Sequence, residues 1–259
     1  MPRFTRWQGL ALCVAALVST VWLAVTNQLI LYIHPRYIVF TVIMAGVGLV
    51  LVVASFWKSA KSDDHDHDTD HDHDHEEPSP RGYRRAISTA GTVVTLVVAV
   101  ALVVVPPATL TTATADQRVI NSTQVGSGTK TVDAAASAPA GAFARFTVLD
   151  WSSLLRQTTD AGFYRDKTAN VVGFITTDTD DPQNVFYVSR FVITCCAVDA
   201  QPVGVPVFLP HWQDRFAADQ WVRVSGSFET TPSTKSQQSI ALVPTATTKV
   251  TQPSEPYLY

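Results

Sequence analysis

Motifs of the common catalytic classes are missing from this sequence of 259 residues. It has no G-x-S-x-G nucleophile elbow, no H-E-x-x-H zinc helix, no phosphate-binding P-loop and no dinucleotide fingerprint. Charged residues make up only 16% of the chain, the formal net charge is −3, and nothing in the sequence resembles a basic nucleic-acid surface. We therefore expect a protein that is not an enzyme and that has no nucleic-acid partner.

Charge is also missing from three long apolar runs, residues 8–25, 37–57 and 86–105. Each run is close to the length of about 20 residues that a membrane-spanning helix needs. Aromatic residues stand at or near the ends of the runs, as in an aromatic belt: Trp7, Trp22, Tyr37 and Trp57. The sequence thus predicts three N-terminal transmembrane α-helices in a lipid bilayer. The first is expected to be an uncleaved anchor, because no convincing A-x-A cleavage site follows it.

The basic residues near these runs predict the orientation, since cytoplasmic loops are enriched in Lys and Arg. Arg3 and Arg6 precede the first run, and residues 26–36 contain only Arg36. Residues 58–85 contain five basic side chains: Lys58, Lys61, Arg81, Arg84 and Arg85. We expect a multi-pass protein of the plasma membrane, with the N-terminus and residues 58–85 cytoplasmic and the C-terminal half extracytoplasmic.

The loop over residues 58–85 is rich in histidine and aspartate. It holds five of the seven histidines of the chain: His65, His67, His71, His73 and His75. Neutral imidazole binds Zn²⁺ and other divalent transition metals, and the neighbouring carboxylates attract a dication. So acidic a segment cannot bury itself, and we expect a disordered loop that binds metal weakly and exchangeably. The alternative is a solvated spacer without a metal role.

The C-terminal half consists of a predicted linker followed by a segment with a β pattern. Residues 106–142 are dominated by Thr, Ala, Ser and Gly, which predicts a flexible linker. Residues 143–259 contain short β-type runs and one helical candidate, 151–157, that Asp150 could cap. Several runs alternate in polarity, for instance Val222 and Val224 against Arg223 and Ser225. We expect a mainly-β domain, an OB-like small barrel, with a β-sandwich as the alternative. A polar turn, or a loose cation site, is expected at three aspartates: Asp178, Asp180 and Asp181.

Cysteine is scarce, with three residues in the chain, and Cys13 lies in the first apolar run. The other two, Cys195 and Cys196, are adjacent. Neighbouring side chains of a strand point to opposite faces, so a joint role for the thiols requires a turn or bulge. Asp199 and His211 could complete a metal-ligand or redox set with them. The alternatives are small thiols packed in a β core, a turn-forming aspartate and a surface histidine.

Residues 190–202, RFVITCCAVDAQP, follow a hydrophobic N-terminal half. In this respect the chain resembles the YcgQ-like family of bacterial permease subunits. The resemblance implies N-terminal membrane helices, a C-terminal β domain with a Cys-Cys-x-x-Asp-Ala motif, and a larger multi-spanning permease as partner. Val198 departs from the small residue expected there. The matching positions are Arg190, Cys195, Cys196, Asp199, Ala200 and, more loosely, Pro202.

Two functions remain open from the sequence. The first is an integral membrane accessory subunit of a permease, linked to metal-ion handling, whose extracytoplasmic β domain binds a ligand or partner. Its helices contain no embedded charge and offer little polar lining for a conduction path. The alternative is a membrane-tethered thiol redox or metal-binding protein that uses Cys195 and Cys196.

Overall fold

The computed structural model describes residues 2–61, 90–91, 93–95, 97–101, 105, 108–122 and 130–259. Within it the chain divides into two compact units, Met1–Ile30 with Pro35–Pro107, and Leu31–His34 with Ala108–Tyr259. The five histidines of the predicted metal-binding loop, at positions 65–75, lie outside the described residues.

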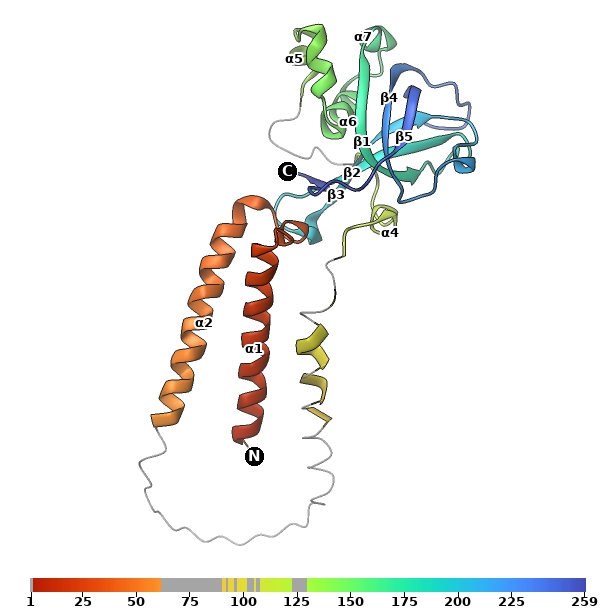
Figure 1. The fold of residues 1–259 in the computed structure, drawn as a ribbon. Coiled ribbons are helices and arrows are strands. Elements are labelled where there is room, and N and C mark those ends of the chain that lie inside the picture. The colour runs from red at the N-terminus through yellow and green to blue at the C-terminus, as the bar shows by residue number, and fades with distance from the viewer. Residues whose placement is uncertain are drawn as a thin grey trace. The chain divides into compact units, whose positions relative to one another are not determined.

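The first unit contains two long helices, α1 (Pro2–Val25) and α2 (Ile38–Lys61), which pack side by side and antiparallel (Figure 1). Their close approach is visible at Gly48, where an added Cβ would lie 3.3 Å from Leu17 of α1. Among the described residues, the helical segment Pro35–Ser55 has the length and composition to cross a membrane, with 21 residues and a mean hydropathy of 2.7. Gly9–Val25 is apolar but shorter.

The third apolar run is described only in part. Its described residues between positions 90 and 101 are helical, and the Thr95 hydroxyl donates to the carbonyl of Gly91 at 2.8 Å. Val105 is a bend whose amide donates to the carbonyl of Ala101 at 3.0 Å, and the other residues of the predicted helix over 86–105 lie outside the described residues. The structure thus supports an N-terminal apolar helix of membrane-spanning length.

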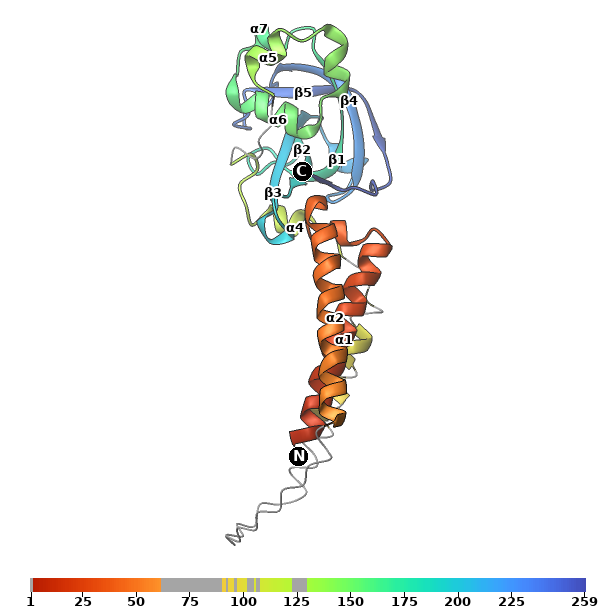
Figure 2. The same cartoon turned by 90° about the vertical axis from the view of Figure 1, so that its left-hand side faces the viewer.

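The second unit is built on a six-stranded mixed sheet with the order β1-β4-β5-β3-β2-β6. Strand β1 also pairs with β2, so the first five strands form a closed cycle of pairings (Figure 2). The pairs β3–β5 and β2–β6 are parallel, and the others are antiparallel. The strands are β1 (Thr168–Thr177), β2 (Val185–Val192), β3 (Gln201–Phe208), β4 (Trp221–Thr230), β5 (Ile240–Lys249) and β6 (Tyr257–Leu258). Closure of this kind is the property expected of a barrel.

Alternation along β4 follows the pattern that the sequence predicts. Val222, Val224 and Phe228 are buried, whereas Arg223 is exposed. A side-chain period of two turns one face of a strand toward the core and the other toward solvent. The pattern is absent from β2, where seven of eight residues are buried, because β2 is covered on both faces.

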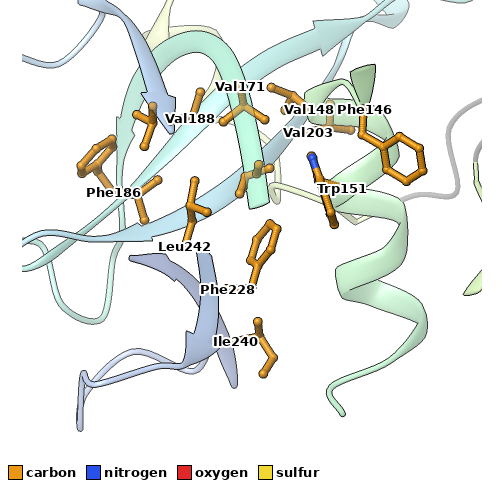
Figure 3. Close-up of a cluster of buried hydrophobic side chains, with 14 of the residues drawn as sticks. Phe146, Val148, Trp151, Val171, Phe186, Val188, Val203, Phe228, Ile240 and Leu242 are labelled. Carbon is orange, nitrogen blue, oxygen red and sulfur yellow. The ribbon is translucent and has the colours of Figure 1, made fainter. Parts of the chain in front are cut away.

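Helix α6 (Val148–Gln157) contributes a tryptophan to the core. Trp151 is fully buried, and its ring centroid lies 4.7 Å from that of Phe228 on β4 (Figure 3). The helix begins three residues before the predicted start. Thr147 is its N-cap, and the Asp150 carboxylate accepts the Thr147 amide at 2.8 Å, so the predicted capping aspartate is one half of a capping box.

In the chain, the 3-10 turn η1 (Leu29–Leu31) follows α1 and η2 (Pro35–Tyr37) precedes α2. The second unit contains further short helices: α4 (Thr112–Ala115), α5 (Val132–Ala136), α7 (Ala161–Tyr164) and the 3-10 turns η4 (Ala140–Arg145), η5 (Ala197–Asp199) and η6 (Trp212–Asp214). Two of them, α4 and α5, lie in the segment expected to be a tether. There the Thr112 amide donates to Asp219 at 2.6 Å, and Asn121 exchanges two hydrogen bonds of 2.9 Å with the backbone of Gly204. The described residues of this segment are therefore attached to the β domain.

We predict that Gly226→Ala destabilises the β domain. A Cβ at this position, beside a β-bulge between β4 and β5, would lie 2.2 Å from the carbonyl oxygen of Val243. Overpacking against backbone costs about 1–3 kcal/mol. Denaturant unfolding of the full chain in detergent, followed by near-UV circular dichroism, measures the loss. Gly141→Ala is the matched control, since nothing lies within 4 Å of its Cβ; equal stability of the two variants would contradict the prediction.

Candidate functional site

The two adjacent cysteines lie in residues 194–200, which we call the cysteine loop. It connects β2 to β3 and contains the 3-10 turn Ala197–Asp199. The backbone bends at Thr194 and Cys195, so the pair does not sit in an uninterrupted strand. Cys195 is exposed, Cys196 is half-buried, and neither belongs to a disulfide. The loop thus departs from a regular strand at Cys195, whereas Cys196 keeps an extended backbone.

The carboxylate of Asp199 holds this loop in shape. It accepts the amide of Cys195 at 2.7 Å and, more weakly, the amides of Thr194 at 3.3 Å and Cys196 at 3.4 Å. Hydrogen bonds to a charged acceptor are stronger than neutral ones. Asp199 thus acts on the backbone of the loop as a turn-former, one of the two roles that the sequence leaves open.

His211 lies at the other end of the same hairpin. The cysteine loop joins Val192 to Gln201, whereas His211 follows Phe208, which pairs with Val185. Seven residues along a strand correspond to about 23 Å. The His211 amide donates to the carbonyl of Gln183. The structure does not bring His211 to the cysteines, and in the part of the chain that it describes no three His, Cys, Asp or Glu residues form a potential metal site.

Sequence reasoning missed the segment that the cysteine loop contacts. Leu31–His34, which follows α1 in the sequence and precedes α2, belongs to the same unit as the β domain. Ile33 and Cys196 form an antiparallel β-bridge. Two backbone hydrogen bonds flank this pair: His34 N to Cys195 O at 3.0 Å and Ala197 N to Tyr32 O at 2.8 Å. Leu31 also packs against a small buried cluster that includes Phe191 and Ala200. The only sequence signal is the apolar and aromatic composition of this short connection.

Arg190, a residue of the predicted motif, holds the C-terminal segment in place by hydrogen bonds to its backbone. Its Nε donates to the carbonyl of Pro256 at 2.7 Å and its Nη2 to that of Glu255 at 2.6 Å. The guanidinium also lies 5.3 Å from the ring centroid of Trp221, a cation–π distance. Burial lowers the pKa of Arg190 from its ordinary value, and an arginine remains charged at neutral pH nevertheless. Its role here is structural.

The C-terminal strand β6 and the residue after it contact both β2 and the segment Leu31–His34. The Ile193 amide donates to the carbonyl of Leu258 at 2.9 Å. The ring of Tyr259 meets the imidazole of His34 edge-on, with centroids 4.9 Å apart. Burial, and secondarily Glu255, raises the pKa of Tyr259 to about 12. The phenol is therefore neutral at physiological pH.

A second polar cluster joins the turn between β1 and β2 to the loop between β4 and β5. The buried Asp178 accepts the amides of Asp180 at 2.9 Å and Asp181 at 2.8 Å, as in a polar turn. The buried Asp181 accepts the hydroxyl of Ser233 at 2.6 Å, and Asp178 accepts that of Ser236 at 3.2 Å. These carboxylates satisfy backbone and hydroxyl donors across two loops, and the polar-turn interpretation accounts for them.

Together these features define a class of protein with an N-terminal pair of apolar helices and a C-terminal mixed β domain that incorporates the connection between them. The chain belongs to the DUF1980 family. Residues 8–121 match the DUF1980 N-terminal domain, and residues 147–259 match the DUF1980 C-terminal domain. No curated protein and no solved structure matches the chain. Leu31–His34 and the cysteine loop thus come from different domains of the family.

We expect Asp199→Ala to loosen the cysteine loop without unfolding the barrel. Removing the carboxylate leaves amides of residues 194–196 without their acceptor, at a cost of about 1–3 kcal/mol. Hydrogen exchange of the full chain should speed up in the loop and in residues 31–34, and not in β4. Val198→Ala, at an exposed position of the same loop, is the control. Unchanged exchange in Asp199→Ala would refute the role assigned to the carboxylate.

Proposed function

We propose that this protein is an integral membrane accessory subunit of a multi-spanning permease, of the YcgQ-like kind, linked to metal-ion handling. In this proposal the β domain is an extracytoplasmic OB-like barrel that binds a ligand or partner. The observation that carries the proposal is the inclusion of Leu31–His34 in the β domain. The chain enters this domain twice, once between its apolar helices and once after them.

This double entry supports three membrane crossings. Segments of one folded unit lie on the same side of a bilayer, because backbone pairing cannot extend through the hydrocarbon. If α2 crosses the membrane after His34, the chain must cross again before Ala108 to rejoin the unit. The uncharged run 86–105 is long enough to supply that crossing. Residues 58–85 then face the other side, which their basic residues predict to be the cytoplasm.

The polar groups of the helices are compatible with lipid. The hydroxyls of Thr20 and Thr41 donate to the carbonyls four residues earlier, Ala16 and Tyr37, both at 2.9 Å. A hydroxyl bonded inside its own helix leaves no unsatisfied donor in the bilayer. The same helices contain no embedded charge to line an ion path. Three such helices would serve better to dock against a transporter than to conduct.

A groove between α1 and α2 supports docking by a partner helix. It is lined by apolar side chains of both helices, among them Leu17 and Trp22 of α1 and Leu49 of α2. Ala45 and Gly46 also line it, and nothing lies within 4 Å of a Cβ added to Gly46. In membranes, small residues allow helix backbones to approach closely, and packing replaces the hydrophobic effect as the driving force.

The link to metal ions rests on the cytoplasmic histidine run. Five imidazoles flanked by carboxylates would collect Zn²⁺ or a similar dication near the inner face of the membrane. The run encodes no fixed ligand geometry, so it would deliver or buffer an ion and would not fix one as a structural site.

We predict that the C-terminus is extracytoplasmic. A periplasm-dependent alkaline phosphatase fused after Tyr259 should be active, and a fusion in residues 58–85 should be inactive. The control is a chain lacking residues 86–105. It has one crossing fewer, so its C-terminal fusion should be inactive. An active phosphatase in the loop together with an inactive one at the C-terminus would overturn the topology and the function built on it.

Co-expression tests the subunit role. We expect the full chain in mild detergent to co-purify with a multi-spanning membrane protein. Gly46→Leu, which fills the groove, should reduce recovery of the partner about tenfold, because a clash at a packed helix interface costs about 1–3 kcal/mol. Gly9→Leu is the control, since its Cβ also points into open space. Recovery of the wild-type chain only as a lone monomer would sink the proposal.

The alternative function, a membrane-tethered thiol redox or metal-binding protein, is favoured by one observation. The cysteine loop carries an exposed and a half-buried thiol at adjacent positions of a bent backbone. A Cys195→Ser/Cys196→Ser chain that captures its partner and keeps full function would eliminate this alternative.

A further inference from the structure

The bridge to Leu31–His34 separates the two thiols. Two hydrogen bonds flank the Ile33–Cys196 pair and none joins the pair itself, which is the pattern of a non-hydrogen-bonded antiparallel pair. In such a pair the side chains of Ile33 and Cys196 share one face of the bridge, and those of the neighbouring residues, His34 and Cys195, take the other. Cys196 accordingly has an extended backbone, with φ −154° and ψ 171°.

A disulfide between adjacent residues requires the opposite arrangement. The two Cβ atoms have to come within about 3.5–4.5 Å on one side of the chain, and neighbouring Cα atoms are closer than a disulfide prefers. Closing the ring therefore turns the peptide that joins the two cysteines. That peptide carries the Cys195 carbonyl, which accepts the amide of His34. Pairing and ring closure compete for the same peptide group.

We propose that Cys195 and Cys196 form a thiol–disulfide switch whose oxidised state excludes pairing with Leu31–His34. The proposal rests on the proposed function only for the oxidising extracytoplasmic compartment; the competition itself is a property of the chain. In the reduced state the β domain holds the connection between α1 and α2, and in the oxidised state it releases that connection.

The oxidant is a disulfide, either a small molecule such as oxidised glutathione or an oxidised protein dithiol. The exposed Cys195 thiolate attacks one sulfur of that disulfide, forms a mixed disulfide and expels one thiolate. The Cys196 thiolate then attacks the sulfur of Cys195 and expels the second. Two cysteine thiols lose two electrons and two protons, and the oxidant becomes two thiols. Attack at Cys195 comes first because Cys196 is half-buried beside the bridge.

Formation of the disulfide and pairing with Leu31–His34 are thermodynamically coupled. If pairing disfavours the disulfide, the disulfide disfavours pairing by the same factor. The pairing involves two backbone hydrogen bonds, and loss of one changes an equilibrium by a few-fold to about tenfold. A factor of this size is large enough to bias the loop and small enough to be reversed by the redox state of the compartment.

The experiment uses the full chain in detergent with Cys13→Ser, equilibrated in glutathione buffers of varied ratio. After acid quench and alkylation, trypsin releases residues 191–215, a peptide with both cysteines and no other. Its mass distinguishes dithiol, vicinal disulfide and mixed disulfide. His34→Pro removes the amide that donates to Cys195. We expect it to favour the vicinal disulfide about tenfold, a midpoint more reducing by about 30 mV.

His34→Ala is the matched control, because it removes the imidazole and keeps the amide donor. It should leave the midpoint of the wild-type chain unchanged. The reciprocal readout is hydrogen exchange, which should accelerate at the amides of His34 and Ala197 when the wild-type chain is oxidised. Equal midpoints for the three proteins, or mixed glutathione disulfides without ring closure, would overturn the switch. A cytoplasmic C-terminus would remove the proposed function and leave these midpoints standing, so the two failures are distinguishable.

Discussion

Two backbone hydrogen bonds, at 3.0 and 2.8 Å, attach Leu31–His34 to the cysteine loop. They place a segment from the middle of the apolar half inside the C-terminal folded unit. Without this attachment the β domain would follow the helices on one tether and carry no information about sidedness. With it, every crossing of a membrane by α2 has to be matched by a second crossing.

The residues of the Cys-Cys-x-x-Asp-Ala motif have distinct physical roles around this attachment. Asp199 holds the backbone of the loop, and Ala200 is fully buried in the small cluster that Leu31 packs against. Arg190 fastens the C-terminal strand. Cys196 precedes the 3-10 turn as its N-cap and pairs with Ile33, and the Cys195 carbonyl accepts the amide of His34. The motif therefore shapes the loop and its pairing, and its two thiols lie within that scaffold.

The sequence predicts what local patterns encode. Alternation along β4 follows from periodicity, and the structure confirms it. The helix near Asp150 is present, but its N-cap is Thr147, three residues earlier, and Asp150 takes part in the capping box as the third helical residue. Contacts between residues that are distant in the sequence could not be predicted. The separation of His211 from Cys195 depends on the register of β2 with β3, and the use of Leu31–His34 depends on a pairing across about 160 residues. Neither leaves a periodic signal. The attachment of Asn121 to Gly204 escaped for the same reason, because a Thr- and Ala-rich composition does not reveal a distant partner.

The energy scale explains why such a contact suits regulation. Two backbone hydrogen bonds contribute about 1–3 kcal/mol together, far less than the barrel core contributes. We therefore expect the barrel to remain folded whether or not the connection is held, since Trp151 and its neighbours lie in a separate cluster from Leu31. A strained ring of two adjacent cysteines is also a weak bond that common thiols reduce. The pairing with Leu31–His34 and the disulfide both require the same peptide group, and each is weak. Small changes in redox conditions can therefore shift the equilibrium between them. The shift attaches or releases the short connection between two apolar helices.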